Sequence, residues 1–160
     1  MTLKELRNSK ELTQKEAAKL AGISLRSYKQ YENDITKHNS FKYKYLLDIV
    51  NKYNFLDETH GVLKVNQIKD IVSDVFEKEY SGKVDFCYLF GSYAKGYAQE
   101  TSDVDLCVST NISGFDYFGL VEVLRTRLHK KVDLLRLVDL KNNIDLLTEI
   151  LKDGIKVYGQ

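Results

Sequence analysis

A glycine-serine step and two closely spaced aspartates are the residues of this chain best suited to chemistry. Gly91 and Ser92 follow one apolar run, and Asp103 and Asp105 stand in another, separated by a single residue. Backbone N–H groups in a glycine-serine turn at the start of a helix can close around phosphate oxygens. Residues two apart on a strand point to the same face, so both carboxylates can converge on a hard cation such as Mg²⁺. The spacing predicts a site for a metal-bound nucleoside triphosphate.

The elements that must position these residues form an alternating α/β pattern in the second part of the chain. Apolar periodicity predicts helices over residues 65–80, 92–98, 115–129 and 142–151. Strands are expected over residues 84–90, 103–109 and 131–137, with a short edge strand at 155–158. About 95 residues are enough for one small mixed sheet with helices on one face.

The first part of the chain is helical and charged from Thr2 to Tyr53. Thr13 followed by Glu16 is a capping box that starts one helix, and Ser24 caps the next, over residues 25–33. A further helix is predicted over residues 40–53. Its inner face should carry the apolar residues that recur at helical spacing, which are Phe41, Tyr45, Leu46, Ile49 and Val50.

Composition and charge favour some classes of protein over others. The 160 residues are 43% hydrophobic and 29% charged, which is typical of a globular protein. Residues 1–54 carry 11 Lys and Arg against 6 Asp and Glu, a net charge of +5, whereas residues 55–160 carry 13 against 17, a net charge of −4. The basic first part indicates an anion-binding module. No apolar run could span a membrane and no signal peptide is apparent, so we expect a cytoplasmic protein with Cys87 and Cys107 reduced and buried.

The motif around the two aspartates resembles the minimal nucleotidyltransferases (MNT) of the DNA polymerase β-like superfamily. Gly91-Ser92 is followed after ten residues by Asp103-Val104-Asp105, and the resemblance covers about residues 65–160. It implies that two Mg²⁺ ions are the cofactor and ATP the substrate, and that Asp133 on a neighbouring strand completes the metal site and helps to activate an acceptor hydroxyl. The implied catalytic and metal-binding residues are Asp103, Asp105 and Asp133, and the implied nucleotide-binding residues are Gly91, Ser92, Lys95 and Ser102.

The same resemblance implies a partner protein. Within this family, MNT antitoxins pair with HEPN ribonuclease toxins and transfer AMP to a tyrosine of the toxin. The α/β part of this chain is too short for a separate acceptor-binding module, so we expect another protein to hold the acceptor. The sequence therefore predicts an antitoxin-type protein adenylyltransferase.

Residues 1–53 resemble the helix-turn-helix of the Cro and phage-repressor family. The resemblance begins at Leu12-Thr13-Gln14 and continues through Tyr31-Glu32-Asn33, while residues 34–39 replace the usual glycine- and proline-containing loop. The third helix would enter the major groove of double-stranded operator DNA. Arg26 or Lys29 would contact guanine, Gln30 adenine and Gln14 a phosphate, and the predicted DNA-binding residues are Gln14, Arg26, Ser27, Lys29 and Gln30.

We therefore expect a helix-turn-helix DNA-binding domain over residues 1–54, a linker over 55–64 and a nucleotidyltransferase domain over 65–160. The antitoxin would repress its own operon, acting as an oligomer or in a complex with its partner. Two alternatives remain for the α/β part: a nucleotide-sensing or inactive domain of a DNA-binding regulator, and a small-molecule nucleotidyltransferase of the aminoglycoside-modifying kind. For the helical part, the alternative is a module that binds only protein.

Overall fold

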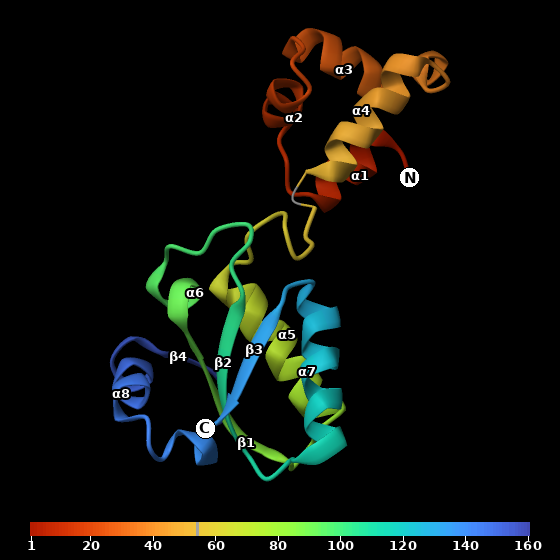
Figure 1. The fold of residues 1–160 in the computed structure, drawn as a ribbon. Coiled ribbons are helices and arrows are strands. Elements are labelled where there is room, and N and C mark those ends of the chain that lie inside the picture. The colour runs from red at the N-terminus through yellow and green to blue at the C-terminus, as the bar shows by residue number, and fades with distance from the viewer. Residues whose placement is uncertain (54) are drawn as a thin grey trace. The chain divides into compact units, whose positions relative to one another are not determined.

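The chain folds into two compact units, Met1–Phe55 and Leu56–Gln160 (Figure 1). The structure, a computed structural model, describes residues 1–53 and 55–160, and the predicted domain boundary at Asn54 lies outside the described residues. Residues 56–64, within the range predicted as a linker, belong to the second unit. Each unit is described separately below.

The first unit is a bundle of short helices. Its elements are α1 (Leu3–Ser9), α2 (Gln14–Leu20), α3 (Leu25–Asn33), a 3₁₀ turn (Ile35–Lys37) and α4 (Phe41–Lys52). Thr13 caps α2 in a complete capping box with Glu16, and Ser24 caps α3 by accepting a hydrogen bond from the Ser27 amide. The predicted all-α helix-turn-helix arrangement is confirmed.

The predicted inner face of α4 is partly wrong. Phe41 and Tyr45 are 86% and 48% exposed. The buried stripe of α4 instead consists of Tyr43, Leu46 and Val50, which recur at the three- and four-residue spacing of one helix face. Phe41 and Tyr45 each lie two positions from Tyr43, which rotates their side chains by about 200° around the helix axis. Both therefore lie on another face of the helix.

The second unit contains a four-stranded sheet with the strand order β3-β2-β1-β4 among the described residues. β1 is antiparallel to both β2 and β4, whereas β2 and β3 run parallel, so the sheet is mixed, as predicted. The elements in chain order are α5 (Val65–Lys78), β1 (Val84–Phe90), α6 (Gly91–Lys95), β2 (Val104–Thr110), α7 (Gly114–Leu128), β3 (Val132–Arg136), a 3₁₀ turn (Leu137–Leu140), α8 (Ile144–Asp153) and β4 (Ile155–Tyr158).

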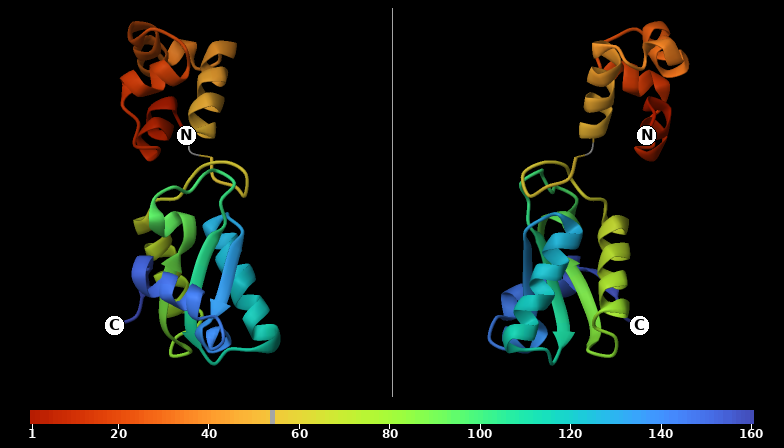
Figure 2. Two further views of the ribbon diagram at one scale, coloured as in Figure 1. Left: turned by 60° about the vertical axis from the view of Figure 1, so that its left-hand side comes forward. Right: turned by 90° about the vertical axis from the view of Figure 1, so that its right-hand side faces the viewer.

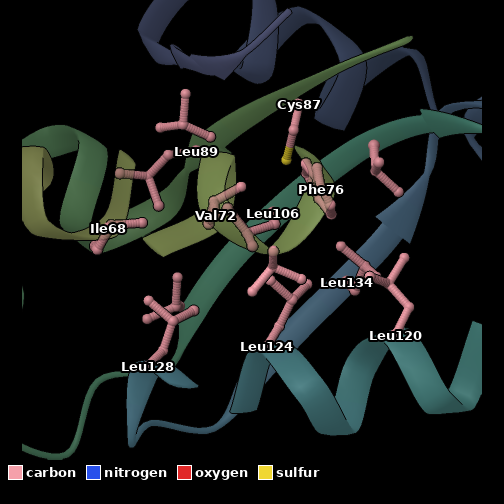
Figure 3. Close-up of a cluster of buried hydrophobic side chains, with 14 of the residues drawn as sticks. Ile68, Val72, Phe76, Cys87, Leu89, Leu106, Leu120, Leu124, Leu128 and Leu134 are labelled. Carbon is pink, nitrogen blue, oxygen red and sulfur yellow. The ribbon is translucent and has the colours of Figure 1, made fainter. Parts of the chain in front are cut away.

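Helices cover both faces of the sheet, which corrects the expectation that they lie on one (Figure 2). On the first face, side chains of α5 and α7 meet those of the strands in the main core, where Figure 3 shows Phe76, Leu106 and Leu124. On the opposite face, Ile150 of α8 packs in a smaller cluster with Phe90 and Cys107. The expectation failed because the sequence pattern shows that α8 is amphipathic but not which face of the sheet its apolar side covers.

The buried strand residues explain this two-sided packing. Side chains alternate along β2, so Leu106 enters the main core while Cys107 faces α8. Cys87 and Cys107 are both buried and unbridged, as expected. Among the described residues, no helix is long and apolar enough to cross a membrane.

Candidate functional site

The predicted phosphate-binding turn and the two predicted metal ligands meet where β1 ends and β2 begins. Gly91 directly follows β1, Asp103 directly precedes β2, and Asp105 is the second residue of β2. Phe90 is paired with Asp105 in the antiparallel ladder. The ladder therefore places Gly91 next to the Asp105 carboxylate.

Only glycine fits at position 91. Its φ is +67°, in the left-handed region that other residues rarely adopt. A Cβ atom there would lie 2.2 Å from Oδ2 of Asp105. The chain thus uses this glycine to bring a main-chain turn against a carboxylate, an approach that any larger residue would prevent.

Asp133 joins the site from β3. It is directly paired with Asp105 in the parallel register, so both side chains leave the same face of the sheet from strands about 4.8 Å apart. This is the face that carries α8, because Cys107 and Leu135, each two residues further along, both pack there. Asp103 and Asp133 are exposed, whereas Asp105 is half-buried.

The carboxylates influence one another electrostatically. Burial, followed by the negative charges of Asp133, Asp103 and Glu149, raises the pKa of Asp105 to about 6. Like charges that share a site disfavour ionisation, and a bound cation reverses that effect. The site therefore concentrates negative charge at a point where a positive ion would relieve it.

The donor set suits Mg²⁺, which prefers oxygen ligands and is commonly held by one or two carboxylates together with substrate phosphates. Within residues 1–53 and 55–160, no group of three or more His, Cys, Asp or Glu side chains already stands in a metal-holding arrangement. Two features of the site nevertheless suit a metal ion bound together with a nucleotide. Asp105 and Asp133 are paired side by side, and Gly91, which has no Cβ, lets the main-chain turn lie against the Asp105 carboxylate.

The three other predicted nucleotide-binding residues lie on α6 or in the loop between α6 and β2. Ser92 is half-buried on α6. Nζ of Lys95 lies 2.6 Å from Oε1 of Glu149, and this hydrogen bond raises the pKa of Lys95. Oγ of Ser102 accepts a hydrogen bond of 2.8 Å from the Gln99 amide, so this serine shapes the loop that leads to β2.

Glu149 is a neighbour of the site that the sequence did not reveal. It lies on α8, in a helix whose amphipathic pattern gives no sign of a role beside Asp105. The only local hint is position, because Glu149 adjoins Ile150, the residue that anchors α8 on the sheet.

On the first unit, the outer surface of α3 carries most of the predicted DNA-binding residues. Arg26, Lys29 and Gln30 are exposed and line a shallow hollow with Leu25 and Asn33. Ser27, by contrast, is half-buried.

Gln14 is engaged within the first unit. Its Nε2 atom donates a hydrogen bond of 2.8 Å to Oε1 of Glu32. Glu32 is buried and also accepts two bonds from the Arg7 guanidinium, at 2.8 Å from Nε and 3.0 Å from Nη2. Sequence reasoning missed this cluster, although Glu32 stands one helical turn after the buried Tyr28, on the same face of α3.

Comparison with known proteins agrees with this geometry. Residues 66–160 match the family model described as polymerase beta, nucleotidyltransferase. This chain belongs to that nucleotidyltransferase family. Residues 3–54 match a helix-turn-helix family model, so the nucleotidyltransferase fold is joined to a helix-turn-helix fold, as predicted.

One relative of this nucleotidyltransferase is the protein MJ1379 of Methanocaldococcus jannaschii, whose name assigns it provisionally to the protein adenylyltransferases. The two are 35% identical over 78 residues, which covers 44% of this chain and 76% of the relative.

Two solved structures are also similar. A crystal structure of a toxin-antitoxin with AMP-PNP gives a TM-score of 0.49 at 26% identity, covering 60% of this chain and 75% of that chain. A structure of the tri-AMPylated Shewanella oneidensis HEPN toxin in complex with MNT antitoxin gives 0.46 at 21% identity, covering 61% and 74%.

Proposed function

We propose that this nucleotidyltransferase transfers AMP from ATP to a tyrosine hydroxyl of a HEPN-type toxin protein and so acts as its antitoxin. The observation that carries the proposal is the pairing of Asp105 with Asp133 beside the Gly91 turn. Membership of the nucleotidyltransferase family supports nucleotidyl transfer as the reaction. The name of the Methanocaldococcus relative and the resemblance of the motif to MNT antitoxins support a protein acceptor.

In the proposed reaction, the acceptor oxygen forms a bond to the α-phosphorus of ATP. The bond from that phosphorus to the bridging oxygen breaks, pyrophosphate leaves, and the proton of the hydroxyl passes to the Asp133 carboxylate and then to water. Asp103, Asp105 and Asp133 would hold Mg²⁺, which when bound supplies positive charge to the triphosphate. Main-chain N–H groups at Gly91 and Ser92 would bind the β- and γ-phosphates.

Lys95 would add positive charge beside the phosphates. Its ion pair with Glu149 is partly open to water, with the two side chains 30% and 37% exposed. Ion pairs of this kind contribute about 0–1 kcal/mol, so a triphosphate can replace the Glu149 carboxylate as the partner of the lysine.

A protein acceptor also agrees with the build of the second unit. In its described residues, the helices and strands either form the sheet or pack on it. This build of the described residues supports the proposal that a partner protein presents the acceptor hydroxyl.

Labelled nucleotide tests this proposal. The full-length protein is mixed with Mg²⁺, ATP and a HEPN-type partner protein, which the proposal expects to be encoded in the adjacent reading frame. Label at the α-phosphate should appear on that protein, whereas label at the γ-phosphate should not, because AMP transfer retains only the α-phosphorus. Neutralisation of the toxin without transferred label would instead favour a domain that senses nucleotide or masks the toxin.

Replacing Ser92 by Ala should slow AMP transfer less than replacing either aspartate of the Asp103-Val104-Asp105 motif. The main-chain donors remain in Ser92→Ala, and one hydroxyl hydrogen bond worth about 0.5–1.5 kcal/mol is lost, equivalent to roughly 2- to 13-fold in kcat/KM. Steady-state kinetics with ATP as the varied substrate measures this. Equal losses in Ser92→Ala and Asp103→Asn would show that the serine has a larger role, such as binding the metal.

We further propose that the first unit binds operator DNA and represses the operon of this protein. Arg26→Ala and Gln30→Ala should each weaken operator binding by about 1–3 kcal/mol if these side chains contact bases. A titration of the full-length protein by electrophoretic mobility shift, with and without the partner protein, measures the change. Lys52→Ala is the control, because it removes a positive charge at the end of α4, away from α3.

The same titration can contradict the DNA-binding role. A net charge of only +5 over residues 1–54 gives one copy few phosphate contacts, and salt weakens each of them. We therefore expect two copies to bind an operator with two-fold character. Equal affinity for the upstream segment and for random DNA, in both conditions, would leave the first unit as a protein-binding module.

A further inference from the structure

Lys130 is a charged residue in the interior of the second unit. Its relative exposure is 0%, and it follows His129, whose φ of +53° ends α7 in the left-handed conformation. Burial lowers the pKa of Lys130, while the negative charges of Asp57 and Glu100 act in the opposite direction. Burying an ammonium group is costly unless polar groups compensate it, so its partners are informative.

The ammonium group joins two segments that are distant in sequence. Nζ donates a hydrogen bond of 2.6 Å to the main-chain oxygen of Glu100 and one of 3.0 Å to that of His60. Glu100 lies in the loop between α6 and β2, three residues before Asp103. The amide of Gly61 donates a further bond of 3.3 Å to Oε1 of Glu100, so the same two segments are joined twice.

The segment on the other side of Lys130 is attached to the second unit chiefly through the buried side chain of Leu63. Leu63 is buried in the main core, and the Arg125 guanidinium of α7 lies 2.5 Å from Oε1 of Glu58. Oδ1 of Asp57 accepts a hydrogen bond of 2.7 Å from the His60 amide. Residues 56–64 therefore give Lys130 a fixed point from which to hold the loop.

Asp103 lies between two anchored positions of that loop. On one side, the Glu100 carbonyl is held by the Lys130 side chain, and on the other, the Val104 amide donates a bond of 2.9 Å to the Lys131 carbonyl. Two consecutive residues after α7 thus fix the main chain on both sides of a predicted metal ligand.

We propose that Lys130 is a positioning residue that holds the 100–104 loop, and with it Asp103, in the place required to bind the metal-nucleotide complex. This inference rests on the proposed function. An apolar side chain of similar length would fill the same space without the cost of a buried charge, so packing does not explain the lysine. Residues that orient metal ligands in this indirect way commonly change metal affinity or activity by about 10- to 100-fold when they are replaced.

The test compares full-length wild type with Lys130→Met, and uses Lys69→Met on the exposed surface of α5 as the matched control. Calorimetric titration with AMP-PNP over a range of Mg²⁺ concentrations measures how much metal half-maximal binding requires. Lys130→Met should need about tenfold more Mg²⁺, with faster amide exchange at Ser102–Val104. Lys69→Met should match wild type in both measurements.

The outcomes separate this inference from the proposed function. If wild type binds AMP-PNP with Mg²⁺ and Lys130→Met requires the same Mg²⁺ concentration, the role of Lys130 is overturned. The proposed function is then unaffected. If wild type does not bind AMP-PNP in the presence of Mg²⁺, the proposed function is overturned, and this inference with it. If Lys130→Met does not fold, Glu100→Gly decides, because it keeps the lysine and loosens the held main chain at an exposed position. It should also raise the Mg²⁺ requirement, and an unchanged requirement would overturn the proposal.

Discussion

Replacing Asp105 by Asn should reduce AMP transfer to the HEPN-type protein by about 10²–10³-fold or more. Asn keeps the shape of the side chain but removes the negative charge that would hold Mg²⁺ beside the Gly91 turn. Quantifying label from α-labelled ATP on the partner protein measures the loss. Asp70→Asn is the matched control, because Asp70 is an exposed carboxylate of α5.

The same substitution should stabilise the metal-free protein at pH 7. The pKa of Asp105 is raised from 3.8 to about 6, so its ionised form is disfavoured in the folded state. Asn removes that cost, which should raise the free energy of unfolding by about 1–2 kcal/mol after allowing for solvent screening. A raised carboxyl pKa destabilises the folded state when the carboxyl is ionised, and this cost is lost as the carboxyl is protonated. The difference from wild type should therefore vanish as the pH falls below about 4.

Thermal unfolding in the presence of a chelator measures this gain, and adding Mg²⁺ with ATP should stabilise wild type but not Asp105→Asn. An Asp105→Asn protein that is less stable than wild type at pH 7 would show that the carboxylate has a structural role. Loss of transfer in that protein could then no longer be attributed to the metal site.

Replacing Glu32 by Ala should destabilise the first unit by about 3–5 kcal/mol. The Arg7 side chain is only 11% exposed and would lose its carboxylate partner in the interior of the unit. A unit of this size is stabilised by only about 3–8 kcal/mol, so a large part of that stability would be lost. Circular dichroism during heating should show early melting of the helical unit, with operator binding lost and AMP transfer retained.

The matched controls separate the buried pair from charge in general. Asp48→Ala breaks an exposed pair with Lys52 and should cost less than about 0.5 kcal/mol. The double substitution Arg7→Met with Glu32→Met should recover much of the stability, because apolar residues remove both buried charges together. A destabilisation by Glu32→Ala no larger than that by Asp48→Ala would contradict the assigned role of the pair.

The pair also predicts a pH dependence. Burial opposes ionisation of Glu32, yet hydrogen bonds from Arg7 and Gln14 lower its pKa below the ordinary value of 4.5. A lowered carboxyl pKa stabilises the folded state above the unfolded pKa. The difference in unfolding free energy between wild type and Glu32→Ala should therefore be present at neutral pH and decline as the pH falls below 4.5.

Much of the candidate site was predictable because it follows local rules. Two-residue periodicity predicts Asp103 and Asp105 on one face of a strand, although β2 begins only at Val104. The Gly91-Ser92 step after an apolar run marks a tight turn. Asp133 followed from the family resemblance. The structure adds that Asp133 is paired directly with Asp105, a register that no local pattern specifies.

The side-chain pairs that the sequence did not reveal all depend on distant contacts. Arg7 meets Glu32 across 25 residues, Lys95 meets Glu149 across 54, and Lys130 meets His60 across 70. A charged residue at such a position looks like an ordinary surface residue in the sequence. Only the packing of helices and loops shows that it is buried or paired.

Intact mass spectrometry of the HEPN-type protein after incubation with this chain, Mg²⁺ and ATP tests the central claim most directly. The account predicts a mass increase of one or more AMP groups, located on tyrosine by fragmentation, which Asp105→Asn fails to produce. An unmodified partner that wild type still neutralises, or a modified partner with wild-type yield from Asp105→Asn, would contradict the account.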